Sequence, residues 1–132
     1  MLTADYTLRS SSTVPFDATV ENVRRELTAE GFGVLCEIDV QATLKAKLDI
    51  DTEPYLILGA CNPPLARRAL EAEPDLGVLL PCNVVVYDRD GETRVAAVDP
   101  ERMLAIVEND ELAPIAADVR SRLERVVARA TL

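Results

Sequence analysis

The sequence predicts an α+β fold, in which helices pack on one face of an antiparallel or mixed sheet. Segments with the two-residue repeat of strands alternate with segments that have the 3.6-residue repeat of helices. Two strand segments are separated by a tight turn, as in a hairpin, and the helical segments are segregated from that hairpin. The chain has 132 residues, of which 48% are hydrophobic, so we expect one domain, residues 1–132, with a core of its own.

The first two predicted strands flank an amphipathic helix. Residues 6–13 fit the first strand. In the helix that follows, we expect Asp17 to be the N-cap and Gly31 to lie just past the end, where a positive φ is favourable. The apolar residues of this helix have helical spacing and are Phe16, Val20, Val23 and Leu27.

The second predicted strand, residues 33–39, leads into a short helix at residues 40–48. Strict alternation would put Val34 and Cys36 on the same face of this strand, so we interpret Cys36 as a core residue. The acidic residues at 49–53 resemble the start of a calcium loop, but the glycine and distal Glu of such loops are missing. We therefore expect a solvated loop there.

The second half of the chain begins with a strand at residues 55–61, followed by a helix. Asn62 is the expected N-cap, Pro63 occupies the favoured first position, and Pro74 ends the helix. An apolar connector then leads to the remaining predicted elements, which are a hairpin of residues 82–88 and 93–98, a helix capped by Asp99, and a last helix at about 112–130.

The central strands are apolar on both faces. Alternation places Leu56, Leu58, Val84 and Val86 on one face, and Tyr55, Ile57, Val85 and Tyr87 on the other. Helices on one side of the sheet would leave the second apolar face bare. A homodimer that covers this face is the simplest remedy, and the alternative is that the chain's own helices cover it.

Composition excludes several classes of function. The net charge of −9 disfavours nucleic acid as a partner. No apolar run approaches the roughly 20 residues of a membrane helix, and the first residues do not resemble a signal peptide, so we expect a cytoplasmic protein without a membrane partner. The acidic surface, with two lysines against twelve arginines, resembles the composition of proteins from salt-loving organisms.

The chain has no histidine, which excludes Ser-His-Asp and Cys-His catalysis and the histidine zinc motifs. It also lacks a phosphate loop and a dinucleotide fingerprint. The sequence therefore indicates no particular cofactor or metal, and it leaves open whether the protein is an enzyme. With three cysteines, an odd number, a disulfide framework is not expected.

Two Cys-Asn dipeptides, Cys61-Asn62 and Cys82-Asn83, are the most distinctive feature of the sequence. Cys61 ends one predicted strand and Cys82 begins another. If these strands are antiparallel neighbours, both thiols lie at the same edge of the sheet and could form a dithiol pair or two soft metal ligands. The alternative is that both cysteines are small packing residues, and that Asn62 serves only as a helix cap.

Four blocks of the chain carry a family resemblance. They are GFGVLCEID at 31–39, YLILGACNP at 55–63, LLPCNVVVY at 79–87 and AVDP at 97–100. With these blocks the chain resembles domain of unknown function family 302 over nearly its whole length. The resemblance implies an α+β fold similar to the TATA-binding-protein-like class and suggests a homodimer, but it does not imply DNA binding. It also directs attention to Cys61, Asn62, Cys82 and Asn83, which match the signature blocks.

Two hypotheses for function follow. In the first, the protein is a small dimeric module in which Cys61 and Cys82 form a redox or ligand- or metal-contacting site, with Asn62 and Asn83 orienting the loops around it. In the second, it is a non-catalytic domain that binds a small molecule or another protein through the apolar sheet face or the dimer seam.

Overall fold

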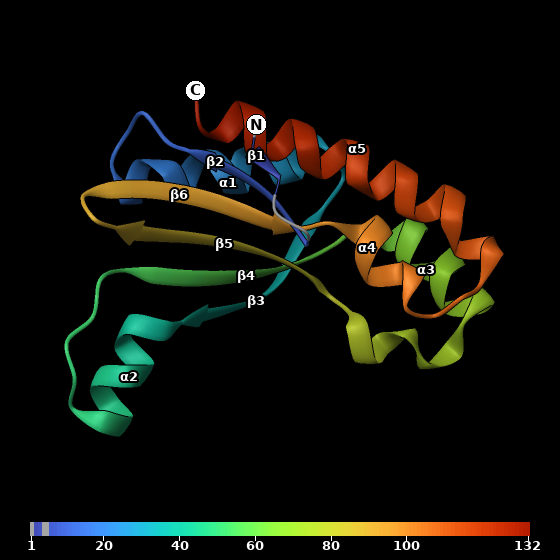
Figure 1. Cartoon of the computed structure of the whole chain (residues 1–132), viewed down its shortest axis with the longest axis horizontal. Coiled ribbons are helices and arrows are strands. Elements are labelled where there is room, and N and C mark those ends of the chain that lie inside the picture. Colours follow the sequence, from blue (N-terminus) through green and yellow to red (C-terminus); the bar gives the residue numbers. More distant parts are fainter. Residues whose placement is uncertain (1, 4–5) are drawn as a thin grey trace.

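The computed structural model describes residues 2–3 and 6–132, and it confirms an α+β fold with an antiparallel sheet (Figure 1). Its strands are β1 (Leu2–Thr3), β2 (Thr7–Ser11), β3 (Gly33–Asp39), β4 (Tyr55–Cys61), β5 (Cys82–Arg89) and β6 (Glu92–Val98). Its α-helices are α1 (Phe16–Ala29), α2 (Val40–Leu48), α3 (Pro63–Ala72), α4 (Pro100–Ala105) and α5 (Ala113–Ala130). Two 3₁₀ helices complete the fold, η1 (Pro74–Leu79) and η2 (Asp110–Leu112).

The six strands form one sheet in the order β1-β2-β6-β5-β4-β3, and every neighbouring pair is antiparallel. The predicted hairpin is β5–β6, where Arg89 pairs with Glu92 across a two-residue turn. Asp90 and Gly91 both have positive φ, 53° and 77°, as a type I′ turn requires. The Asp-Gly dipeptide is therefore the local cause of this hairpin.

Helices α1 and α5 pack against one face of the sheet, and α3 and α4 lie near one end of the strands (Figure 1). The face under α1 and α5 carries the side chains that alternation assigns to the core. Leu58, Val84 and Val86 are fully buried there, and burial of one such side chain contributes about 1.5–3 kcal/mol to stability. The predicted division of the central strands into two faces is thus confirmed.

The N-terminus of α1 differs from the prediction. The helix begins at Phe16, Pro15 is its N-cap residue, and no side chain caps it, so Asp17 lies in the first turn. There the carboxylate of Asp17 faces the positive end of the helix dipole. The C-terminus is as predicted: Gly31 has φ 84°, and Phe32 N–H donates to the carbonyl of Leu27 at 2.9 Å, which forms a Schellman motif.

The prediction that Cys36 is a core residue is wrong. The pairing of β3 with β4 shifts between Val34 and Cys36, so Leu35 is an extra residue in a β-bulge. Val34 remains on the helix side of the sheet, whereas Cys36 turns to the opposite face and is exposed. Its Sγ atom lies over Gly59, where a Cβ atom would overlap this sulfur. Gly59 is therefore required at that place in β4.

Helix α2 extends away from the other helices at the β3 side of the sheet (Figure 1). Asp39 caps it by accepting a hydrogen bond from Ala42 N–H at 2.9 Å, but none of its residues is buried. The predicted connector after Pro74 is instead the 3₁₀ helix η1, with Leu76 buried in the core. Within the described residues, no helix is both long enough and apolar enough to cross a membrane.

Candidate functional site

The face of the sheet opposite α1 and α5 presents ordered rows of side chains. The strand register places Ser11, Arg94, Tyr87 and Tyr55 in one row. The central row contains Arg9, Ala96, Val85, Ile57 and Ile38. A third row has Thr7 opposite Val98 on one side and Asn83, Gly59 and Cys36 on the other. We call this surface the open face.

The open face carries a groove of about 570 Å³ that is open to solvent. Val85, Ala96 and Val98 form its apolar floor, and Val40 and Leu44 of α2 stand at one side. This volume falls in the range of about 300–1,000 Å³ that is typical of sites for small organic molecules. Helix α2, which contributes nothing to the core, therefore helps to shape this groove.

Two tyrosines stack at one end of the groove. The rings of Tyr55 and Tyr87 are 5.3 Å apart between centroids and inclined by 22°. Arg94 lies opposite Tyr87 in the strand register and pairs with Glu92 at 3.5 Å, so its guanidinium is engaged within the protein. Burial, and then the neighbouring Tyr87, raise the pKa of Tyr55, which stays neutral at physiological pH. The pair is a fixed aromatic surface with two polar hydroxyls.

Arg9 lies on the other side of the groove, in β2. It is half-buried beside Ala96 and forms no ion pair with any residue that the structure describes. The hydroxyls of Thr7 and Thr52, which also line the groove, are buried and have no hydrogen-bond partner among the described residues. The groove thus combines an apolar floor with polar groups whose bonding capacity is not used.

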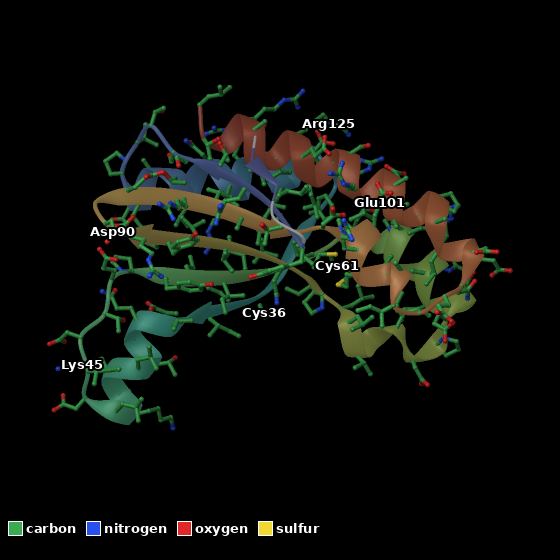
Figure 2. All side chains as sticks on the ribbon, in the orientation of Figure 1. Cys36, Lys45, Cys61, Asp90, Glu101 and Arg125 are labelled. Atoms are coloured by element: carbon green, nitrogen blue, oxygen red, sulfur yellow. The ribbon has the colours of Figure 1, made fainter. Side chains whose placement is uncertain are left out.

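The structure brings together three of the four residues that the sequence predicts as a thiol site, since Cys61, Asn62 and Cys82 line one cavity and Asn83 does not. Cys61 is half-buried at the end of β4 that leads into α3 (Figure 2), and Cys82 is buried directly opposite its neighbour Ala60. Asn62 is buried, whereas Asn83 is exposed and lines the open-face groove. The predicted antiparallel neighbourhood of the two strands is confirmed, and it brings the two thiols to the same end of the sheet.

Cys61 and Cys82 line one small apolar cavity of about 50 Å³, together with Met103 of α4. Burial, and then the proximity of Cys61, raise the pKa of the Cys82 thiol to about 11. Cys82 is therefore protonated and weakly nucleophilic at neutral pH. Within the described part of the chain, no three Cys, Asp or Glu side chains are grouped as metal ligands would be.

Asn62 has a structural task that accounts for its burial. Its Oδ1 accepts a hydrogen bond from Leu65 N–H at 3.4 Å, which caps α3 as predicted, with Pro63 in the first helical position. Its Nδ2 donates to the carbonyl of Glu30 at 3.3 Å, at the end of α1. The oxygen and the nitrogen of this amide therefore link the start of α3 to the end of α1.

Sequence reasoning identified Tyr55, Val85 and Tyr87 as residues of the open face but missed Arg9, Thr7 and Thr52. Arg9 and Thr7 alternate with the buried Leu8 in β2, and that alternation was the only available signal. Thr52 lies in a loop, and only the folded chain brings this loop to the groove.

Comparisons with known proteins place the chain in a structural context. The family model for domain of unknown function DUF302 matches residues 6–130. A crystal structure of an uncharacterized conserved protein DUF302 from Bacillus stearothermophilus is similar, with a TM-score of 0.90 and 32% sequence identity. The match covers 96% of this chain and 99% of that one. A search of curated proteins found no match.

Proposed function

The chain belongs to the DUF302 family, and we propose that it is a non-catalytic binding domain whose open face takes a small organic molecule. The observation that carries this proposal is the groove of about 570 Å³ over an apolar sheet surface. Ligand sites typically combine an apolar lining with a few polar groups that fix orientation. Val85 and Ala96 supply the lining here, and Arg9, Asn83 and the tyrosine hydroxyls supply the polar groups.

A fragment library measured by ¹H–¹⁵N NMR tests this function. Ligands of the groove should shift the backbone amides of β5 and β6 around Val85 and Ala96. A Val85→Asp variant should abolish these shifts, because it places a charge in the centre of the apolar floor. Val78→Asp is the matched control, since Val78 is 86% exposed on η1 and lies outside the groove.

The proposal fails if the fragments shift no amide on the open face, or if Val85→Asp and Val78→Asp bind them equally well. It also fails if sedimentation shows a tight dimer in which the amides around Val85 are protected from solvent exchange. In that case a second copy of the chain is the occupant of the face.

As a second candidate, we propose that Cys61 and Cys82 form a site for a thiophilic group. The supporting observation is that both thiols line one cavity with the thioether of Met103. Sulfur ligands of this kind prefer soft cations such as Cu(I). The raised pKa of Cys82 opposes metal binding, because a coordinating thiol must lose its proton.

Thiol labelling and metal analysis test this second candidate. Cys36 is exposed and would react first, so the measurements use a Cys36→Ser background. Binding of one Cu(I) per chain, lost in both Cys61→Ser and Cys82→Ser, would support the site. Unreactive, metal-free thiols, with both variants behaving like the parent, would show that the cysteines are packing residues.

A further inference from the structure

We propose that the ligand of the open-face groove is an amphipathic anion, with a flat apolar body on the sheet and an anionic headgroup on Arg9. This inference rests on the proposed function and specifies the chemistry of the ligand. It is drawn from the position of Arg9, from its lack of an acidic partner among the described residues, and from the apolar surface beside it.

Arg9 occupies the central row of the open face, directly beside Ala96 and two strands from Val85. The chain carries a net charge of −9, yet this half-buried guanidinium has no carboxylate partner among the described residues. A partly desolvated guanidinium gains more from an anion than a solvated one does, and its planar donors match a carboxylate. Arg94, which is two residues from Ala96 on the neighbouring strand, already pairs with Glu92.

The rest of the groove selects the body of the ligand. Val85 and Ala96 offer a flat apolar surface, and the stacked rings of Tyr55 and Tyr87 border it. Glu53 and Arg89 line the groove near the β5–β6 turn, and Asp88 accepts a hydrogen bond from Thr93 on the helix side of the sheet. Glu53 and Arg89 carry opposite charges, so the contact with the anion is assigned to Arg9, which is half-buried beside the apolar floor.

The test compares two probes of the same shape, 2-naphthoate and 2-naphthamide, by NMR titration of the wild-type protein. The carboxylate should bind about tenfold more tightly than the amide, as one charge-assisted hydrogen-bonded pair predicts. Arg9→Gln should remove this preference, and Arg9→Lys should retain part of it. Arg68→Gln makes the same change in net charge on the exposed surface of α3 and should leave the preference intact.

The outcomes separate the two proposals. If naphthoate and naphthamide bind the open face equally, or if Arg9→Gln keeps the preference, the anion inference is overturned while the binding function stands. If the probes shift no amide around Val85, both proposals fail. The affinity for naphthoate should also fall with added salt, whereas that for naphthamide should not.

Discussion

Glu30 connects three helices at the end of α1. Its backbone carbonyl accepts hydrogen bonds from Asn62 Nδ2 at 3.3 Å and from Arg122 Nη1 at 3.0 Å. Its carboxylate, which is almost buried, pairs with Arg125 at 2.8 Å and with Arg129 at 3.4 Å. Figure 2 shows Arg125 on α5, the long helix that covers the sheet. The charge-assisted hydrogen bond from Arg125 lowers the pKa of Glu30.

Replacing Glu30 by Gln should destabilise the protein by about 1 kcal/mol at neutral pH, because the hydrogen bonds lose their charge and the exposed arginines are partly screened. Since the folded-state pKa lies below the ordinary 4.5, this contribution is complete above pH 4.5. It should disappear as the pH falls through the folded-state pKa. Urea unfolding of wild type and variant at several pH values measures it.

Glu21→Gln is the control for Glu30→Gln, because Glu21 is exposed on α1 and forms no ion pair with a described residue. It should change the free energy of unfolding by less than about 0.5 kcal/mol. A Glu30→Gln effect that stayed constant down to pH 3 would contradict an electrostatic origin.

At the scale of the elements, the two Cys-Asn dipeptides play unequal parts. Asn62 begins α3 and joins it to α1, whereas Asn83 is exposed in β5. Replacing each asparagine by alanine therefore distinguishes the loss of a helix cap at position 62 from the loss of an exposed amide at position 83.

Asn62→Ala should lower the free energy of unfolding by about 1–2 kcal/mol, because a helix cap and a buried hydrogen bond are lost together. Asn83→Ala should change it by less than about 0.5 kcal/mol. Thermal unfolding of both variants measures the difference. If both variants changed the free energy of unfolding equally, Asn62 would not stabilise the protein by capping α3.

The elements themselves were largely predictable. Apolar periodicity identified α1 and the faces of β4 and β5, and Asp90-Gly91 identified the hairpin, because these signals act within a few residues. The bulge at Leu35 was not predictable, since it depends on how β3 pairs with β4. Strict alternation therefore assigned Cys36 to the wrong face.

The groove was predictable only in part. Val85 of its floor and the two tyrosines follow from alternation in β4 and β5, but Arg9, Thr7 and Thr52 come from β2 and from the loop after α2. These segments meet only through the strand order β2-β6-β5, which no local signal in the chain encodes. For the two thiols, the sequence predicted that Cys61 and Cys82 lie at the same end of the sheet. It did not predict the burial of Cys82, because that burial depends on the side chains packed around it in the folded chain.

For the whole molecule, we predict a homodimer formed at the β3–α2 side. Large apolar side chains are exposed there: Ile38 by 48%, Leu48 by 63% and Ile50 by 44%. Exposed apolar groups of this kind mark association surfaces, and α2 has no buried residue that would hold it against its own chain.

Sedimentation velocity over a range of concentrations tests the dimer. Leu48→Lys should weaken association by about tenfold or more, because it removes an apolar contact and introduces a charge. Val78→Lys, on the exposed η1, should have no effect. A protein that is monomeric at all concentrations would exclude the dimer.

The bulge at Leu35 has a consequence for how far such assembly can go. β3 is one edge of the sheet, and the bulge lies within it. A regular, uninterrupted edge strand is a template to which further chains can add their own strands, as in fibrils. Because the bulge breaks the hydrogen-bonding register of β3, this border of the sheet does not favour the addition of further strands. Copies of this protein should therefore associate through side chains at this border, and the concentrated protein should resist forming fibres through it.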